Sequence, residues 1–160
     1  MLEIKRDLSL ALVQEWHYML FKDSKPDIAS IIRKKQVYIS ASKYIPPSPV
    51  EVFPMLMDFF RWYNRNKNGR IHPVELAALV QLKFVTIHPF HDGNGRISRL
   101  MMNFVLERKG YPMFNIPYEG RSSYYSALER SQLSKIESIF MNWITRNYVK
   151  QHRRYLKIKQ

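Results

Sequence analysis

The sequence predicts an all-α domain that carries one small β-hairpin. Apolar residues recur at three- and four-residue spacing through most of the chain, which is the period of amphipathic helices. Residues 36–45 are instead rich in β-forming residues. No repeat, low-complexity tract or long linker divides the 160 residues, so we expect residues 1–160 to form a single domain.

The predicted hairpin interrupts the helical pattern early in the chain. Residues 7–21 predict an amphipathic helix, and residues 27–33 are compatible with a short second one. The hairpin follows at 36–45, and the prolines at 46, 47 and 49 stop any further strand. Because an isolated two-stranded hairpin is only marginally stable, its presence in a helical chain suggests a role at the surface.

Helices account for the rest of the chain. An apolar stripe from Val52 to Tyr63 predicts one helix, and Pro73 is well placed to begin another that runs to about Thr86. A glycine-rich loop comes next, and the helix after it ends near Gly110, a suitable C′ glycine. Two further helices are predicted, near residues 121–131 and 135–152.

Composition excludes several classes of protein. Hydrophobic residues make up 46% and charged residues 24%, ordinary values for a soluble globular domain. Cysteine is absent, which excludes disulfides, Cys-ligated zinc and a thiol nucleophile. No run of about 18 apolar residues predicts a membrane span, and residues 1–7 lack the apolar core of a signal peptide. We therefore expect a cytoplasmic protein with no membrane partner, or a catalytic piece of a longer chain.

The net charge of +13 favours polyanionic partners such as nucleotides or nucleic acid. The excess is uneven, because no acidic residue follows Glu137 while six basic residues do. The basic C-terminal helix, at about 135–160, has two interpretations. It is a solvated helix face, or it contacts a phosphate backbone.

The loop from His88 to Arg99 combines features that suit a polyphosphate. Glycines at 93 and 95 allow close approach of a backbone whose successive N–H groups form an anion-binding nest. The helix that begins directly afterwards points its positive end at the same place. Arg96 and Arg99 are three residues apart, so both guanidinium groups lie on one face of its first turn.

Asp92 and His88 add chemistry to this loop. A carboxylate beside the nest would repel phosphate unless a cation intervenes, so Asp92 is the predicted ligand of Mg²⁺ or Mn²⁺. His88 lies where the preceding helix ends, and its imidazole is a natural general base at neutral pH. A calcium loop is disfavoured, since no glutamate stands at the closing position. His17 and His152 show no ligand spacing with another His, Asp or Glu.

The segment His88-Pro89-Phe90-His91-Asp92-Gly93-Asn94-Gly95-Arg96-Ile97-Ser98-Arg99 resembles the signature of the Fic family at every fixed position. The motif is long and specific, and the resemblance extends over about residues 7–145. Within a motif core at 72–110, residues 72–78 resemble the preceding helix. Residues 36–47 resemble the family's flap, and residues 124–128 resemble its later nucleotide-side helix.

The resemblance implies a protein adenylyltransferase that moves AMP from ATP to a Tyr, Thr or Ser hydroxyl and releases pyrophosphate. His88 would deprotonate the hydroxyl and Asp92 would hold the metal. Nucleotide contacts would come from Gly93, Asn94, Gly95, Arg96, Arg99, Tyr124, Tyr125 and Gln132. The target protein would present its hydroxyl in an extended segment, docked by strand addition to the flap residues Val37, Tyr38, Ile39 and Ser40.

The resemblance is greatest to the subgroup with an N-terminal inhibitory helix, whose Ser/Thr-x-x-x-Glu motif has no match here. Glu119-Gly120 comes nearest, but Asn115 stands where Ser or Thr is required. The sequence therefore shows no inhibitory glutamate that would pair with Arg99. An inhibitory segment, an antitoxin-like partner and a second copy of the chain in a homodimer are candidate partners. A non-catalytic nucleotide- or nucleic-acid-binding regulator is an alternative. A phosphoryl transferase is another, disfavoured because the related kinases carry Lys at the position of Gly95.

Overall fold

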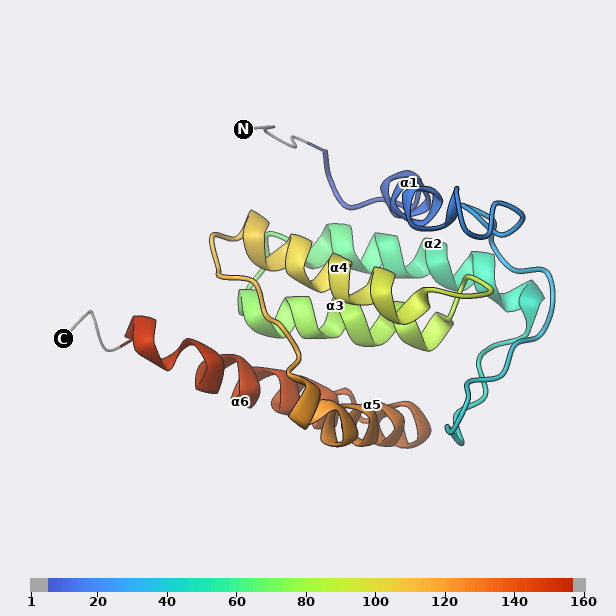
Figure 1. The fold of residues 1–160 in the computed structure, drawn as a ribbon. Coiled ribbons are helices and arrows are strands. Elements are labelled where there is room, and N and C mark those ends of the chain that lie inside the picture. Colours follow the sequence, from blue (N-terminus) through green and yellow to red (C-terminus); the bar gives the residue numbers. More distant parts are fainter. Residues whose placement is uncertain (1–5, 157–160) are drawn as a thin grey trace.

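A computed structural model describes residues 6–156 of the chain (Figure 1). The described part is helical, which confirms the predicted all-α class. Its elements are α1 (Leu10–Phe21), α2 (Pro49–Asn66), α3 (Pro73–Ile87), α4 (Asn94–Arg108), a short 3₁₀ turn at Tyr118–Gly120, α5 (Arg121–Ser134) and α6 (Glu137–Leu156).

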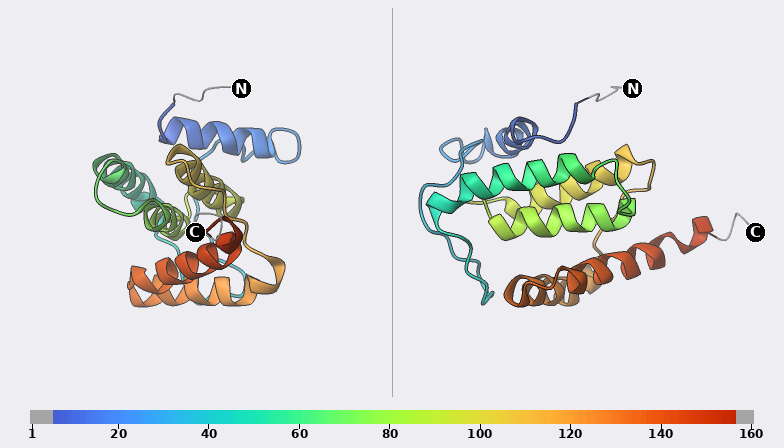
Figure 2. Two further views of the ribbon diagram at one scale, coloured as in Figure 1. Left: turned by 90° about the vertical axis from the view of Figure 1, so that its left-hand side faces the viewer. Right: turned by 180° about the vertical axis from the view of Figure 1, so that it is seen from behind.

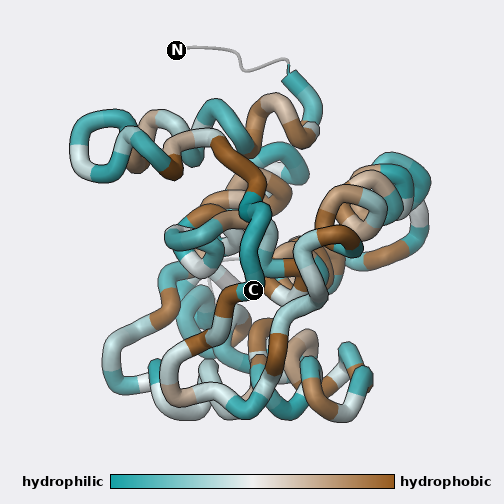
Figure 3. Tube along the Cα trace, turned by 90° about the vertical axis from the view of Figure 1, so that its right-hand side faces the viewer, coloured by the Kyte–Doolittle hydropathy of each residue, from teal (hydrophilic) through white to brown (hydrophobic). Residues whose placement is uncertain are grey.

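Helix α3 is the centre of the fold. In Figures 1 and 2, α2, α3 and α4 run alongside one another, with α1 on one side and α5 and α6 on the other. Eleven of the fifteen residues of α3 are buried, as expected for a helix surrounded by neighbours. Hydrophobic and hydrophilic residues are interspersed along the chain (Figure 3), and the outer helices bury apolar residues such as Val13 of α1 and Phe140 and Ile144 of α6, as expected when one face of a helix packs on a core.

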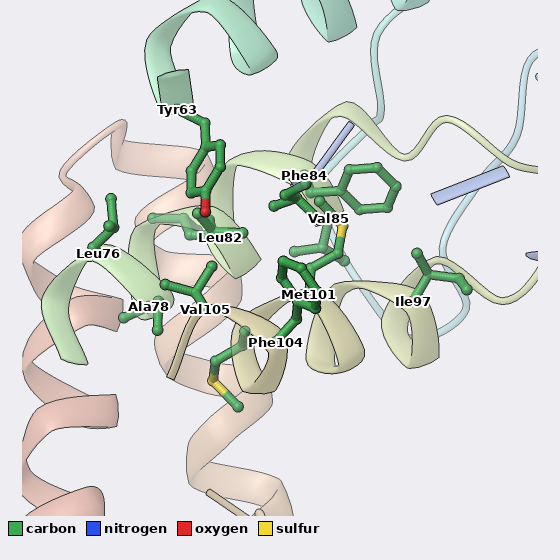
Figure 4. Packing of buried hydrophobic residues seen from close by; sticks show 14 of the residues in the cluster. Tyr63, Leu76, Ala78, Leu82, Phe84, Val85, Ile97, Met101, Phe104 and Val105 are labelled. Atoms are coloured by element: carbon green, nitrogen blue, oxygen red, sulfur yellow. The ribbon is translucent and has the colours of Figure 1, made fainter. Parts of the chain in front are cut away.

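The core lies between α2, α3 and α4. Tyr63 of α2, Leu82 of α3 and Met101 of α4 are all at most 4% exposed, and their side chains lie in one shared interior (Figure 4). Phe84 on α3 contacts Phe90 of the following loop, with ring centroids 6.3 Å apart. The loop between α3 and α4 is thus anchored to the core at one of its own residues.

Local sequence signals account for several helix ends. Ser9 caps α1 by accepting a hydrogen bond from the Leu12 amide, and Ser48 with Glu51 forms a capping box at the start of α2. Gly110 follows α4 with φ 74°, and its N–H donates to the Glu107 carbonyl. The predicted C′ glycine is therefore confirmed.

The predicted β-hairpin does not form. Within residues 6–156 the β-type pairing is a single antiparallel bridge, between Ile32 and Phe90. Residues 36–45 instead form a loop that folds back on itself (Figure 1), with Gln36 Nε2 donating to the Pro46 carbonyl at 3.0 Å. Prolines at 46 and 47 donate no N–H to a ladder, and a two-stranded ribbon alone is marginal. We call residues 36–45 the flap loop.

The short helix expected at 27–33 is also absent, and turns take its place. Ser30 has φ 65°, which a right-handed helix does not allow, and its N–H donates to Nδ1 of His17 at 2.9 Å. A tertiary hydrogen bond has replaced the helical one. Among the described residues, no helix combines the length and hydrophobicity needed to cross a bilayer.

The last helix begins at Glu137 and is described as far as Leu156. Of the predicted basic segment at 135–160, Lys157 and Lys159 lie outside the described residues. Arg153 and Arg154 lie in its last described turn, where cations are favoured by the helix dipole. The two interpretations of the basic segment, a solvated helix face and a contact with a phosphate backbone, both stay predictions.

Candidate active site

The loop between α3 and α4 is closed by the side chain of Asn94. Its Oδ1 accepts from the Phe90 N–H and its Nδ2 donates to the Phe90 carbonyl, both at 2.9 Å. Asn94 is only 2% exposed. Its side chain therefore holds the loop in shape, and only its backbone N–H is left for a ligand.

Gly93 occupies a position where a side chain would be strained. Its φ is 82°, in the left-handed region. A Cβ at this position would lie 2.6 Å from Cε2 of Phe21, a ring atom of α1. Both the backbone angle and the packing against α1 explain why the loop carries glycine here.

His88 lies at the C-terminal end of α3 in a left-handed conformation, with φ 53° and ψ 58°. Its Nδ1 is 3.2 Å from the Val85 carbonyl. A carbonyl only accepts, so Nδ1 carries the proton and Nε2 is left as a free base. Burial lowers the pKa of His88; the bond to Val85 raises this pKa and the cation of Arg33 lowers it. The imidazole is therefore neutral at pH 7.

Arg33 fixes this end of α3. Its guanidinium donates to the carbonyls of His88 at 2.6 Å and Pro47 at 2.7 Å, and more weakly to those of Lys35 and Ile87. It is 4% exposed. A buried cation at a helix C-terminus is favourable because the free carbonyls there carry partial negative charge. Sequence reasoning did not single out Arg33, since its acceptors come from three separate segments.

Asp92 is held from two sides. Its Oδ1 accepts from the Gly93 N–H at 2.6 Å, and its Oδ2 accepts from the ammonium of Lys25, also at 2.6 Å. Arg96 is more distant, 3.8 Å from Oδ1. The bond to Lys25 is the main reason why the pKa of Asp92 lies below its usual value. The carboxylate is ionised at neutral pH, and Oδ2 is the oxygen that faces a cation.

His17 on α1 holds the loop between α3 and α4 against α1. Its Nδ1 accepts from the Ser30 N–H, so its Nε2 carries the proton and donates to the Asp92 carbonyl at 3.0 Å. It is fully buried and stacks on Phe90, with ring centroids 3.8 Å apart. The sequence contained no spacing that singles out His17, because its partners lie 13 and 75 positions away.

The first turn of α4 presents backbone donors. The N–H of Ile97 makes the first helical bond, to the Gly93 carbonyl, so the amides of Asn94, Gly95 and Arg96 have no acceptor within the helix. Arg99 lies one turn later. A Cβ on Gly95 would be 3.3 Å from Nη1 of Arg99, so the absence of a side chain at 95 makes room for that guanidinium.

Arg99 shares a small cavity with two of the predicted nucleotide residues. It lines a space of 100 Å³ together with Tyr124 and Tyr125 of α5, and with Asn115, Ile116 and Arg121. Tyr124 is 2% exposed and its hydroxyl accepts from Nε2 of Gln81 at 2.5 Å. Burial raises the pKa of Tyr124 to about 12. Tyr125 is 54% exposed and is the ring open to a ligand.

Gln132 does not line this cavity. Its Nε2 donates to the Thr86 hydroxyl at 3.3 Å, one residue before the end of α3. It shares the face of α5 that carries Tyr125 and Glu129, since these positions are spaced i, i+4 and i+7. Gln132 thus lies on the side of α5 that faces the end of α3 and the flap loop.

The flap loop contacts α5 at its tip. Glu129 Oε1 accepts from the hydroxyl of Ser42 at 3.0 Å and from the backbone N–H of Lys43 at 2.5 Å. Tyr44 donates to the Thr86 carbonyl at 2.9 Å. Of the predicted flap residues, Val37 is buried, Ile39 is half-buried, and Tyr38 and Ser40 are exposed. Tyr38, at 76%, is among the most exposed aromatic side chains described.

These elements match a known family model. The model of the Fic/DOC family matches residues 7–106, more than half of the chain. The chain belongs to the Fic/DOC family. This confirms the resemblance that the His88–Arg99 motif predicted. The match spans α1, the flap loop, α3 and the loop from His88 to Arg99, so it includes His17 and Lys25 as well as the motif.

Named relatives and solved structures agree with the Fic/DOC assignment. Protein adenylyltransferase Fic of Drosophila melanogaster is 41% identical over 125 residues, which are 78% of this chain and 25% of that protein. The structure of Fic-1 (residues 134–508) from C. elegans is 32% identical with a TM-score of 0.81, covering 96% of this chain and 44% of that one. A Fic-domain signaling protein from Bacteroides thetaiotaomicron is 27% identical with a TM-score of 0.70, covering 91% and 63%. This Fic chain therefore spans about a quarter of its curated relatives.

Proposed function

We propose that this Fic chain is a Mg²⁺-dependent protein adenylyltransferase that transfers AMP from ATP to a side-chain hydroxyl of a target protein. The observation that carries the proposal is the arrangement at the His88–Arg99 loop. A neutral imidazole with a free Nε2 lies at one end, and a helix N-terminus with unpaired amides lies at the other. The names of the relatives, at up to 41% identity, support the same activity.

The proposed reaction is a displacement at the α-phosphorus. The target hydroxyl oxygen forms a bond to the α-phosphorus as the bond from that phosphorus to the bridging oxygen breaks, and pyrophosphate leaves with that oxygen. His88 Nε2 accepts the hydroxyl proton, because Nδ1 is committed to the Val85 carbonyl. Gly93 allows close approach of the backbone, the amides of Asn94, Gly95 and Arg96 donate to the phosphates, and the guanidinium groups of Arg96 and Arg99 bind them as well.

The residues present fit a divalent metal at Asp92. Its Oδ1 is engaged by the Gly93 amide, which leaves Oδ2 as a ligand, and that oxygen already binds a cation. In the described residues no three His, Cys, Asp or Glu side chains are grouped to hold a metal. Phosphate oxygens and water would therefore complete the coordination, as is common for Mg²⁺. When bound, the metal would offset phosphate charge and favour the leaving group.

The flap loop supports a target that binds in an extended conformation. Its ends are held by Arg33 and Gln36, and its tip by Glu129, so the loop is fixed at both ends while Tyr38 and Ser40 remain exposed. A strand added to this loop would receive main-chain bonds with little dependence on sequence. We propose that Val37, Tyr38, Ile39 and Ser40 align the target.

The experiment that tests the proposed function compares labelled nucleotides. Incubation with Mg²⁺ and α-labelled ATP is expected to label the chain itself or a target, and His88→Ala is expected to abolish labelling. γ-Labelled ATP is expected to leave no label on protein. His91→Ala is the matched control, since His91 is an exposed neighbouring imidazole. Its labelling should equal that of the wild type.

Two other outcomes contradict the proposal. Label from γ-labelled ATP alone would identify a phosphoryl transferase. Absence of labelling from either nucleotide, combined with tight salt-dependent retention of an oligonucleotide, would favour a binding protein. The net charge of +13 is the observation that keeps this second function in the test.

A further inference from the structure

Three side chains of α1 and its C-terminal extension follow one another along the loop from Phe90 to Gly93. His17, Phe21 and Lys25 are spaced i, i+4 and i+8, so all three lie on one face. His17 donates to the Asp92 carbonyl, Phe21 packs against Gly93, and Lys25 binds the Asp92 carboxylate. The first two bind the backbone of the loop, and only Lys25 contacts the functional oxygen.

The position of Lys25 is set by its neighbours. Its backbone N–H donates to the Phe21 carbonyl at 2.8 Å, which extends the turn after α1. Its ammonium lies 5.7 Å from the centre of the Phe21 ring and 2.6 Å from Asp92 Oδ2. Arg96 lies over the same ring at 4.9 Å. The two cations thus approach Phe21 and Asp92 together, and Lys25 is the nearer one to the carboxylate.

The ammonium of Lys25 occupies the carboxylate oxygen that a divalent metal would need. Oδ1 is held by the Gly93 amide, so a metal and Lys25 compete for Oδ2. An ammonium and a metal ion both neutralise a carboxylate, but only the metal also coordinates phosphate. Lys25 should therefore affect binding of ATP in opposite directions with and without the metal. Lys25 opposes the metal complex, and it favours binding of phosphate when metal is absent because it screens Asp92.

We propose that Lys25 is a built-in counter-cation that holds Asp92 in the metal-free protein and is displaced when the metal nucleotide binds. It is a positioning residue, since it acts through Asp92. The inference rests on the proposed metal role of Asp92. Displacement is inexpensive because the pair is partly exposed, at 54% for the Lys25 side chain and 40% for that of Asp92. An ion pair of this kind contributes little net stability in water.

The test measures binding of ATP by titration calorimetry in the His88→Ala background, where no turnover occurs. One arm contains EDTA and the other contains Mg²⁺. Lys25→Met is expected to weaken binding in EDTA, because Asp92 then repels phosphate. It is expected to leave binding with Mg²⁺ unchanged or tighter, because a competitor is gone. The dissociation constant in EDTA divided by that in Mg²⁺ should therefore rise about twofold to fivefold in Lys25→Met, the range that corresponds to the energy of a partly exposed ion pair.

Lys22→Met is the matched control. Lys22 is an exposed lysine three residues before Lys25, and its backbone caps α1. Its substitution by methionine removes the same charge without touching Asp92. Its ratio should equal that of the wild type. Equal weakening of both arms by Lys25→Met would mean that Lys25 binds phosphate directly, and an equal shift in Lys22→Met would mean that only overall charge matters. Either result overturns the inference.

Asp92→Asn separates this inference from the proposed function. It should remove most of the dependence on Mg²⁺, and adding Lys25→Met to it should change neither arm. Persistence of the Mg²⁺ dependence in Asp92→Asn would overturn the proposed metal role itself. Loss of that dependence, with an unchanged ratio in Lys25→Met alone, would overturn only the role of Lys25. Circular dichroism of each variant confirms folding, which surface substitutions at 22 and 25 should leave intact.

Discussion

The imidazole of His17 lies flat against the ring of Phe90, with centroids 3.8 Å apart and an interplanar angle of 16°. This contact joins α1 to the first half of the loop between α3 and α4, while the bond from His17 Nε2 to the Asp92 carbonyl joins α1 to its second half. A buried, fully bonded histidine thus holds the loop against α1, at a position where the sequence alone pointed to no function.

His17→Leu should destabilise the fold. Leucine has similar bulk but leaves the Ser30 N–H and the Asp92 carbonyl without their partners. Two unsatisfied, partly buried groups predict a loss of about 1–3 kcal/mol in the free energy of unfolding, measured by urea denaturation. His91→Leu, at an exposed position of the same loop, should change it by less than about 0.5 kcal/mol. A loss of similar size in both variants would contradict the role assigned to His17.

Substitutions at the two loop glycines should have different consequences. Gly93→Ala forces a side chain into φ 82° and against Phe21, so the free energy of unfolding should fall by roughly 1–2 kcal/mol from the backbone alone. Gly95→Ala has no such strain, and Ala favours a helix over Gly by about 0.5–1 kcal/mol, so stability should not fall. Thermal unfolding of the two variants distinguishes these effects.

Gly95→Ala should instead affect the nucleotide. Its Cβ would lie 3.3 Å from Nη1 of Arg99, which must move by a few tenths of an ångström. If Arg99 binds the terminal phosphate, the preference for ATP over ADP should decrease. Titration of both nucleotides checks this, with Arg99→Ala as the reference for complete loss. An unchanged ratio in Gly95→Ala, beside a reduced one in Arg99→Ala, would show that the guanidinium tolerates the extra carbon.

Glu129→Ala should release the tip of the flap loop. Its carboxylate accepts from Ser42 and from the Lys43 amide, and these are the bonds by which Glu129 joins the tip to α5. Faster cleavage within residues 36–45 is expected in limited proteolysis, with a decrease in target labelling and no change in ATP binding. Glu119→Ala, an acidic residue of the 3₁₀ turn before α5, is the control. Equal cleavage of both variants would mean that other contacts hold the flap loop.

Stability should depend on pH through two histidines. Burial lowers the pKa of His17 and of His88 below the ordinary value of 6.5. Between the lowered and the ordinary pKa, the unfolded chain binds more protons than the folded one, so the free energy of unfolding rises with pH there. Stability is therefore lost as pH falls from about 6.5 through the lowered values.

This pH effect can be assigned by urea denaturation across the range from pH 7 to pH 5. His17→Gln should reduce the slope of unfolding free energy against pH, because one of the two contributions is removed. The carboxylates with lowered pKa values, Asp7 and Asp92 among them, lose their contribution only at more acidic pH. A slope identical in the wild type and in His17→Gln would contradict the assignment to His17.

The local pattern of the chain was sufficient for most of its helices. Proline at position 73, glycine at 110 and the apolar spacing each act within a turn or two, so the ends of α3 and α4 could be predicted closely. The flap failed as a hairpin because β-forming residues predict extended backbone, whereas a ladder also needs a partner with free N–H groups. Here the Gln36 side chain and Arg33 join the two arms instead.

The sequence by itself determined the family and the residues of the candidate active-site loop, because the motif from His88 to Arg99 is contiguous in the chain. Tertiary structure decided what surrounds that loop. It brought His17 and Lys25 to Asp92 and the guanidinium of Arg33 to the His88 carbonyl. It also bonded the Asn94 side chain to the backbone of Phe90, which closes the loop. These contacts join residues far apart in the chain, and they exist only because the packing of α1, α3 and α4 brings their partners within hydrogen-bonding distance.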